Sequence, residues 1–392
     1  MKKVTVIGLG YIGLPTSLFF AKAGYEVNGI DVNEEAVNKL KQGIITFDEP
    51  GLNDLFQSVK EKINFATKPV VADLFIITVP TPFNEDKTID EKYINIAFDD
   101  IKNLLKKGDS IVLESTVPPM VTEKMISKIE SLGFKVGQDI YLAHVPETII
   151  PGNMVKEFET NKRLIGGATT KCAQVIADYY RKVVKGEIIL TDLRTAEFTK
   201  VIENTFRDVN IAVANEFMRL ADKLGIDVYE AIEIANKHPR VNILSPGLGV
   251  GGHCISVDPW FLVGLFPKSA NLINTARIIN DEQPIYIFDK LSKQYNLTNK
   301  TVGVYGLSYK PNTDDVRESP TFTFIDILKQ NNISYTSFDP YFVKEKVEAK
   351  QLLDFDEFIN SCDIVVLCLK HDHILKNINK LKNKQVFTTF KK

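Results

Sequence analysis

A glycine-rich stretch of the chain carries a cysteine, Cys254, four residues before the carboxylate of Asp258. A thiol becomes a useful nucleophile when neighbouring charges or dipoles lower its pKa. The glycines around Gly251 would let backbone N–H groups approach a bound ligand, and Asp258 could act as a base or orient a water molecule. The stretch therefore indicates covalent chemistry on sulfur. The alternative is that Cys254 is a small buried apolar side chain, the commoner role of cysteine.

A second chemical signal is the glycine motif near the N-terminus, which follows a strand-like run and opens a helix. Glycines at this spacing allow a tight turn, close approach of the backbone to a pyrophosphate and close helix–strand packing. Asp31 ends the next strand-like run, where it can accept hydrogen bonds from the ribose hydroxyls and would repel a 2′-phosphate. NAD is therefore favoured over NADP, the alternative being a glycine turn without a ligand. The residues expected at the cofactor are Gly8, Gly10, Tyr11, Ile12, Gly13 and Asp31.

Three more polar residues follow strand-like runs: Thr81, Thr116 and Glu147. The carboxyl ends of parallel strands face the cofactor crevice of such a sheet. The two threonines could therefore bond to the dinucleotide or position water, and Glu147 would place a carboxylate nearby. The alternatives are that proline simply ends the strand beside each threonine and that Glu147 is a surface acid.

The segment from about Asp192 to Leu224 contains no proline, and its apolar residues recur at helical spacing. This pattern predicts one helix of about 30 residues that spans two domains and could pair with a second copy in a homodimer. The residues expected to mark one apolar face are Phe198, Val201, Ile202, Thr205, Phe206, Val209, Ala212 and Val213.

The same helix carries a polar stripe of Lys200, Asn204 and Asp208 at intervals of four residues. The stripe is either a solvated helix face or, at Lys200 and Asn204, an oxyanion clamp. In a clamp, a cation and an amide donor point to where negative charge develops.

The elements that position these groups predict an α/β fold with two Rossmann-like domains. Residues 1–190 are expected to form an NAD-binding domain with a mostly parallel sheet. A central helical domain over 191–295 would hold the long helix, the cysteine loop and the dimer contact. A smaller α/β domain over 296–392 begins with a strand and a glycine turn. The strand-like runs are 3–7, 26–31, 74–79, 110–114, 141–144, 163–166, 301–305 and 363–369.

Composition argues against several classes of protein. The 392 residues include 48 basic and 50 acidic side chains, a net charge of -2, so neither a nucleic-acid partner nor an anionic membrane is indicated. The four cysteines form no CxxC pair, which argues against a disulfide framework or zinc site and suits a reducing compartment. No membrane span is expected, and the cytoplasm is the expected location. His371 and His373 could be a metal pair, but a ligand-contacting loop is favoured and no metal site is predicted.

These motifs together resemble the UDP-glucose/GDP-mannose dehydrogenase family, and the matching segments run along the whole chain. They are Val6-Ile-Gly-Leu-Gly-Tyr-Ile-Gly-Leu-Pro15, Glu114-Ser-Thr-Val-Pro-Pro119, Pro146-Glu147, Glu197-Phe-Thr-Lys200 with Asn204, Gly251-Gly-His-Cys254 with Asp258, and Gly306-Leu-Ser-Tyr-Lys310 through Arg317-Glu-Ser-Pro320.

The resemblance implies a four-electron oxidation in which the C6 alcohol of a UDP-sugar becomes a carboxylate and two NAD are reduced in turn. By position, Cys254 would attack the C6 aldehyde to give a thiohemiacetal, and its oxidation would leave a thioester. Thr116 and Glu147 would position the water that hydrolyses this thioester.

The resemblance also implies roles for the remaining residues. Lys200 and Asn204 would stabilise oxyanions, and Asp258 would assist proton transfer. Arg317 would contact the cofactor across a domain cleft, the alternative being a surface ion pair with Asp314 or Glu318. The expected substrate-binding residues are Glu147, Lys200, Asn204, Arg240, Asn242, Gly251, His253, Tyr309 and Lys310.

The segments His238 to Asn242 and Gly249 to Trp260 look most like the UDP-N-acetyl-D-mannosamine-oxidising members of the family. Glucose-acting members typically carry Pro-Lys-Asp after the cysteine, where this chain has Ser256-Val257-Asp258. The absent lysine argues against UDP-glucose. The expected substrate is therefore UDP-N-acetyl-D-mannosamine, for surface polysaccharide biosynthesis. The alternatives are UDP-N-acetylglucosamine or UDP-glucose, and a non-catalytic sensor that only binds NAD and nucleotide-sugars.

Overall fold

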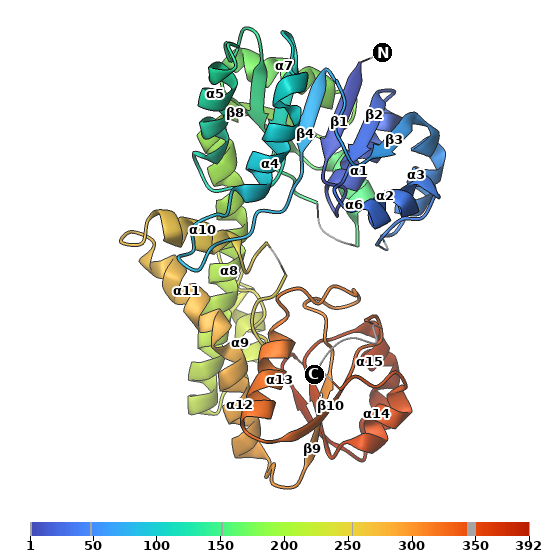
Figure 1. Cartoon of the computed structure of the whole chain (residues 1–392). Helices are drawn as coiled ribbons and strands as arrows, with labels where there is room; N and C mark the ends of the chain where they lie inside the picture. The colour runs from blue at the N-terminus through green and yellow to red at the C-terminus, as the bar shows by residue number, and fades with distance from the viewer. Residues whose placement is uncertain (1, 48, 150–151, 253, 343–349, 392) are drawn as a thin grey trace. The chain divides into compact units, whose positions relative to one another are not determined.

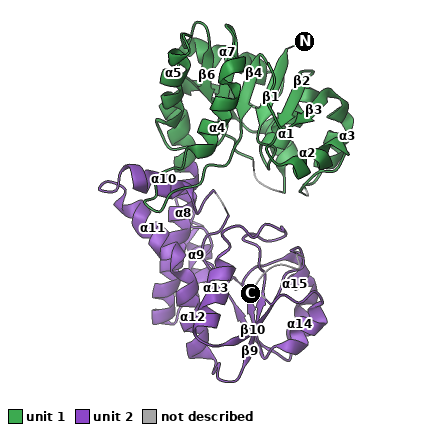
Figure 2. Cartoon of the chain, in the orientation of Figure 1, with its two compact units in different colours: residues 1–202 green, residues 203–392 purple. Residues whose placement is uncertain are grey.

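The computed structural model describes residues 2–47, 49–149, 152–252, 254–342 and 350–391 (Figure 1). The chain divides into two compact units, Met1–Ile202 and Glu203–Lys392 (Figure 2). The boundary lies inside the long helix α8 (Leu193–Leu224). Each unit is described separately below.

The described part of the first unit is built on a sheet of eight strands in the order β3-β2-β1-β4-β5-β6-β7-β8. All neighbouring strands are parallel except β6 and β7, which are antiparallel. The chain order reverses between β1 and β4, the switch point at which open α/β sheets bind ligands. The strands are β1 (Lys3–Ile7), β2 (Glu26–Ile30), β3 (Ile63–Ala66), β4 (Leu74–Ile77), β5 (Ser110–Leu113), β6 (Tyr141–His144), β7 (Arg163–Gly167) and β8 (Ile188–Asp192).

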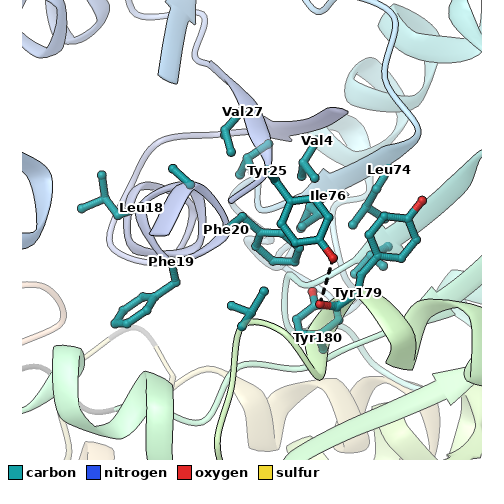
Figure 3. Packing of buried hydrophobic residues seen from close by; sticks show 14 of the residues in the cluster. Val4, Leu18, Phe19, Phe20, Tyr25, Val27, Leu74, Ile76, Tyr179 and Tyr180 are labelled. Atoms are coloured by element: carbon teal, nitrogen blue, oxygen red, sulfur yellow. Dashed lines mark hydrogen bonds between the residues drawn. The ribbon is translucent and has the colours of Figure 1, made fainter. Parts of the chain in front are cut away.

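Helices cover both faces of this sheet because successive strand residues point to opposite sides and both sets are apolar. On one face, Val4 of β1 packs with Phe20 of α1 and Tyr180 of α7 (Figure 3). On the other, Phe75 of β4 packs with Phe98 of α4. The helices are α1 (Gly13–Lys22), α2 (Glu34–Lys41), α3 (Leu52–Val59), α4 (Lys92–Ile101), α5 (Val121–Ser131), α6 (Met154–Thr160) and α7 (Thr170–Tyr180), with short 3₁₀ turns at Lys60–Lys62 and Lys102–Leu104.

The second unit combines a helical part with a smaller parallel sheet in the order β10-β9-β11-β12. Its core joins α12 and α13 to this sheet through residues such as Leu291, Phe324 and Val304. The helices are α9 (Val228–Ala235), α10 (Asp258–Leu265), α11 (Asn271–Asp281), α12 (Gln283–Gln294), α13 (Pro320–Gln330), α14 (Phe355–Ser361) and α15 (Asp372–Asn377), with a 3₁₀ turn at Ile378–Leu381. The strands are β9 (Thr301–Tyr305), β10 (Ser334–Phe338), β11 (Ile364–Leu367) and β12 (Gln385–Thr388).

The predicted fold class is confirmed: two mostly parallel sheets are linked by a helical segment that contains a helix of 32 residues. Sequence reasoning did not find β3, β8, β10 or β12. All four lie at sheet edges. β8 has only exposed and half-buried residues, and β10 mixes exposed with buried ones, so both lack the continuous apolar run of a central strand.

The prediction that the apolar residues of α8 mark a single face is wrong. Val201 and Ala212 are buried, whereas Phe206 is 68% exposed. The helix therefore has one apolar face against its own chain and a second that is exposed. We call the second face the exposed α8 stripe; it consists of Phe198, Ile202, Phe206, Val213, Phe217, Leu220 and Leu224.

Candidate active site

The turn after β1 is built for close packing at its glycines. Gly8 has a φ of +94°, and a Cβ there would lie 2.6 Å from the carbonyl oxygen of Thr78. A Cβ on Gly13 would lie 1.7 Å from the carbonyl oxygen of Gly8. At Gly10, by contrast, a Cβ would meet nothing within 4 Å. The two outer glycines therefore permit the turn itself, whereas Gly10 leaves space open above it.

Asp31 is held at the end of β2 by this turn. Its Oδ2 accepts a hydrogen bond from the backbone N–H of Leu9 at 2.8 Å, and its Oδ1 accepts one from Asn33 at 2.9 Å. A carboxylate has about four acceptor positions, so capacity remains for ribose hydroxyls. The open space at Gly10, the start of α1 and this half-buried carboxylate fit a dinucleotide at the switch point.

The other predicted cofactor residues of the first unit lie around the same strand ends. Ile12 precedes the first residue of α1, and the ring of Tyr11 stacks on Phe47 at 4.3 Å between centroids. Thr81 Oγ1 donates to the carbonyl oxygen of Thr116 at 2.8 Å. The structure thus joins the loops after β4 and β5 through the two threonines that the sequence singled out.

Glu147 is buried, so the alternative of a surface acid is wrong. It accepts hydrogen bonds from the backbone N–H groups of Thr148 at 2.7 Å and Ile149 at 3.1 Å. The guanidinium of Arg163, also buried, donates to its Oε2. These bonds fix the orientation of the carboxylate at the end of β6.

A second buried carboxyl group, Glu114, lies beside this ion pair and was not predicted. Its Oε1 is 3.8 Å from Arg163 Nη1, and its Oε2 accepts from Thr16 Oγ1 at 3.0 Å. Burial, with the added charge of Glu147, raises the pKa of Glu114 to about 8. The group therefore holds a proton at neutral pH, which leaves Arg163 and Glu147 as a balanced pair. Glu114 lies within one of the segments that resemble the family, yet a strand-end glutamate gives no sign of its tertiary partner.

Replacing Glu114 with glutamine should stabilise the protein progressively as pH rises from 5 to 8. In this range the folded state retains a proton that the unfolded chain has released, so the stability of the unmodified protein falls with rising pH. Since one pKa unit is about 1.4 kcal/mol, the difference near pH 8 should reach roughly 3 kcal/mol. Thermal unfolding between pH 5 and 8 measures it. Glu130→Gln, at an exposed position, is the control. A pH-independent difference in Tm would contradict the protonated state.

The cysteine loop packs against the loop that follows β9. A Cβ on Gly251 would lie 2.7 Å from Cβ of Tyr309, and one on Gly252 would lie 2.9 Å from the Tyr309 ring. The N–H of Gly252 also donates to the carbonyl oxygen of Arg317 at 2.9 Å. These glycines therefore have a packing role, and they bring the candidate nucleophile together with predicted substrate and cofactor residues of the same unit.

Cys254 differs from the other three cysteines in being only half-buried. Its carbonyl oxygen accepts from the N–H of Asp258 at 2.8 Å, so the thiol lies on a turn that leads directly into α10. Cys172, Cys362 and Cys368 are buried, as predicted, and burial raises the pKa of Cys362 to about 11 and of Cys368 to about 12. Of the four thiols, Cys254 is the one with partial access to solvent and hence to a substrate.

Asn204 and Asp258, both predicted as catalytic, are hydrogen-bonded to each other. Asn204 Nδ2 donates to Asp258 Oδ2 at 2.6 Å, and both side chains are buried. Asp208, one turn further along α8, is also buried and pairs with Arg277 at 2.6 Å. A solvated helix face is therefore the wrong interpretation at Asn204 and Asp208. Lys200, half-buried, belongs to the first unit.

The remaining predicted residues have less enclosed positions. Arg317 makes a two-pronged contact with Asp315, at 2.8 Å from Nε and 2.5 Å from Nη2, which is neither of the acids that the sequence suggested. Lys310 is half-buried in the same loop, and Arg240 and Asn242 are exposed before the cysteine loop. His253 lies outside the described residues.

Two negative observations apply to the described ranges. Within them, no group of three or more His, Cys, Asp or Glu side chains is placed to hold a metal ion. A search of the same residues for a helix with both the length and the apolar character needed to cross a membrane finds none.

The first unit thus has the fold and the glycine turn of an NAD-dependent oxidoreductase, and the second unit adds a half-buried thiol. Comparison with family models assigns the class more closely. Residues 2–184 match the NAD binding domain of the UDP-glucose/GDP-mannose dehydrogenase family, residues 194–282 its central domain and residues 303–391 its UDP binding domain. The chain belongs to this family and is an NAD-dependent UDP-sugar dehydrogenase.

Individual relatives match over almost the whole chain. A UDP-N-acetyl-D-mannosamine dehydrogenase of Methanococcus maripaludis is 44% identical, covering 99% of this chain and 92% of the relative. An NDP-N-acetyl-D-galactosaminuronic acid dehydrogenase of Ralstonia solanacearum is 41% identical, with 99% and 95% covered. The solved UDP-N-acetyl-mannosamine dehydrogenase of Staphylococcus aureus superposes with a TM-score of 0.90 at 42% identity, covering 99% of this chain and 94% of that one.

Proposed function

We propose that the protein oxidises the C6 alcohol of UDP-N-acetyl-D-mannosamine to the carboxylate of UDP-N-acetyl-D-mannosaminuronate, for surface polysaccharide biosynthesis. The observation that carries this proposal is the 44% identity, over 99% of the chain, to a UDP-N-acetyl-D-mannosamine dehydrogenase. The sequence Ser256-Val257-Asp258, without the lysine typical of glucose-acting members, supports it.

The covalent part of the reaction uses Cys254. After the first oxidation the thiolate bonds to the C6 aldehyde carbon, and the aldehyde oxygen takes a proton, giving a thiohemiacetal. Loss of a hydride and a proton then leaves a thioester. Water adds to C6, the carbon–sulfur bond breaks, and the thiol is regenerated beside the carboxylate. NAD, bound at the Gly8–Gly13 turn, supplies the hydride acceptor for each oxidation.

The surrounding side chains stabilise negative charge and transfer protons during the reaction. The bond from Asn204 to Asp258 fixes the amide orientation, which an oxyanion donor requires, and Lys200 adds a cation for the same charge. Asp258 would assist proton transfer; its N–H bond to the Cys254 carbonyl supports this role. Glu147, oriented by Arg163, serves with Thr116 to position the hydrolytic water.

A substrate panel tests the sugar specificity. NADH formation should be measured with UDP-N-acetylmannosamine, UDP-N-acetylglucosamine, UDP-N-acetylgalactosamine and UDP-glucose. We expect the mannosamine substrate to have the highest kcat/KM by about tenfold or more, since groups that bond the N-acetyl substituent in one orientation would be left unpaired by an epimer or by glucose. The galactosamine arm is included because of the Ralstonia relative. A mannosamine substrate that ranks last would refute the assignment, and binding without turnover for all four would favour a sensor.

We also propose that the protein is a homodimer formed through the exposed α8 stripe. Its members recur every three or four residues except between Phe206 and Val213, where the half-buried Val209 fills the interval. An apolar strip of this length on one helix is a typical helix-pairing surface. Phe206, at 68% exposed, is its least covered phenylalanine.

Phe206→Asp should convert the dimer to a monomer, because a charge would be buried without a partner in the contact. Light scattering coupled to size-exclusion chromatography measures the mass. Arg207→Asp, which introduces the same charge at an exposed neighbour outside the stripe, should leave the dimer intact. A dimer that persists in Phe206→Asp would place the contact elsewhere.

A further inference from the structure

The glycine turn of the second sheet repeats that of the first, bond for bond. Gly306 has a φ of +93°, and its N–H donates to the carbonyl oxygen of Phe338 at 2.8 Å, as Gly8 donates to Ile30 at 2.7 Å. The next N–H, that of Leu307, donates to Asp339 Oδ2 at 2.7 Å, as Leu9 does to Asp31. Asp339 therefore occupies the position of a ribose-binding carboxylate.

Asp339 cannot perform that role, because its acceptor positions are all used. Beyond Leu307, its Oδ2 accepts from the N–H of Ser308 at 3.0 Å. The Ser308 hydroxyl lies 3.1 Å from the same oxygen, but its one proton has a shorter bond to the Thr313 carbonyl, at 2.6 Å. Its Oδ1 accepts from the backbone N–H groups of Tyr341 and Phe342, at 2.8 and 3.0 Å. Four backbone N–H donors fill the roughly four acceptor positions of a carboxylate, and Asp339 is only 2% exposed.

The fully buried imidazole of His371 lies against this carboxylate, with Nε2 3.4 Å from Asp339 Oδ2. Burial alone would raise the pKa of Asp339, but the contact with His371 and the backbone donors lower it to about 2. On the other side of the ring, Nδ1 accepts from the N–H of Asn312 at 2.9 Å. Nδ1 is therefore the unprotonated nitrogen and Nε2 carries the proton. Nε2 contacts the Asp339 charge at 3.4 Å without forming a hydrogen bond to it.

Asn312 connects this pair to the Tyr309–Arg317 loop. It has a φ of +61°, a left-handed conformation that needs support in a residue with a side chain. Its side-chain oxygen accepts from the N–H of Asp372 at 2.9 Å, so two bonds tie it to the 371–372 segment. Lys310 lies two residues before it, and Thr313 Oγ1 donates to the Lys310 carbonyl at 3.1 Å.

We propose that His371, oriented by Asp339, is a positioning residue that holds the Tyr309–Arg317 loop in the geometry that binds the UDP portion of the substrate. This inference rests on the proposed role of Lys310 as a substrate contact. Asp31, after the first glycine turn, is expected to bind ribose, whereas Asp339, at the equivalent position in the second sheet, supports the loop. His371 acts through Asn312 and does not touch the substrate.

The test compares His371→Leu, which removes the acceptor, with His371→Gln, whose side-chain oxygen can still accept from Asn312. Calorimetric titration measures binding of UDP and of NAD, and steady-state kinetics separates KM from kcat. For His371→Leu we expect the UDP dissociation constant and the KM for UDP-sugar to rise about tenfold, the loss of one buried hydrogen bond. The NAD affinity and kcat should stay within about twofold, and His371→Gln should recover most of the UDP affinity.

His373→Leu is the matched control, because His373 contacts Tyr305 at 3.1 Å and not the loop; its UDP affinity should be unchanged. If His371→Leu does not fold, Asn312→Gly, at an exposed position, is the second variant. It keeps the backbone N–H that bonds to His371 but removes the side-chain bond to Asp372, the other tie of the loop to the 371–372 segment, and it should also raise the UDP dissociation constant. Equal UDP affinity in His371→Leu and the unmodified chain, or an equal loss in His373→Leu, would overturn the positioning role. Failure of the unmodified chain to bind UDP would refute the proposed function instead.

Discussion

Cys254→Ala is expected to abolish formation of the uronic acid, with a loss in kcat of roughly a thousandfold or more. The thioester route requires a sulfur nucleophile, and Cys254 is the half-buried thiol among the four cysteines. Binding of NAD and of UDP-sugar should change by no more than about twofold, since the substitution removes one small side chain. Product analysis by mass spectrometry, alongside NADH release, measures the loss.

Cys172→Ala provides the matched control, because it removes a buried thiol from the first unit and should leave the rate of oxidation unchanged. A complementary measurement uses Glu147→Gln, in which slow hydrolysis should allow a sugar adduct to accumulate on Cys254. Normal acid production by Cys254→Ala would remove the covalent mechanism. NAD consumption by Glu147→Gln with no adduct at any time would contradict the thioester.

Gly13→Ala should be the most damaging substitution at the cofactor turn. A Cβ there would lie 1.7 Å from the carbonyl oxygen of Gly8 and 2.4 Å from Thr78 Oγ1, so the turn and the start of α1 must separate. We expect a loss of roughly 3 kcal/mol or more in the free energy of unfolding and no measurable NAD binding. Thermal unfolding with and without NAD, and calorimetric titration, measure the two effects.

Gly10→Ala is expected to lower NAD affinity without lowering the stability of the fold. Its Cβ would meet no atom of the chain within 4 Å, so the Tm without NAD should be unchanged. The added methyl group would instead occupy the space expected for the pyrophosphate, and NAD affinity should fall about tenfold or more. Unchanged NAD affinity in Gly10→Ala would show that the pyrophosphate does not bind at this turn. A Gly13→Ala variant that is stable and binds NAD would contradict the close packing expected at Gly13.

How much of the site the sequence predicts depends on whether the interaction is local. The glycine turn and Asp31 were predictable because their spacing encodes one βαβ unit. The length of α8 was predictable from proline-free helical spacing, but its two apolar faces were not, because periodicity alone does not say which apolar residues the rest of the chain covers. Phe206 and Val201 look equivalent in the sequence, although one is exposed and the other buried.

Side-chain pairs between residues far apart in the sequence could not be predicted from spacing. Glu114 and Arg163 come together only because β5, β6 and β7 are neighbours in the sheet, and the antiparallel β6–β7 pair could not be inferred from strand patterns. Asn204 and Asp258 were both singled out, but their direct hydrogen bond needed the structure. The His371–Asn312 bond was missed because it joins two loops of ordinary composition.

The saturated carboxylate of Asp339 has a consequence for the timing of catalysis. Of the two glycine turns described, the carboxylate at Asp31 keeps acceptor capacity for a ribose, whereas four backbone donors fill the carboxylate of Asp339. In the proposed four-electron reaction, the two oxidations would share one dinucleotide position, so the reduced cofactor would have to leave and a fresh one arrive between them. The carbon–sulfur bond at Cys254 would then have to persist while the cofactor is exchanged. A longer-lived covalent adduct would release less of the half-oxidised aldehyde.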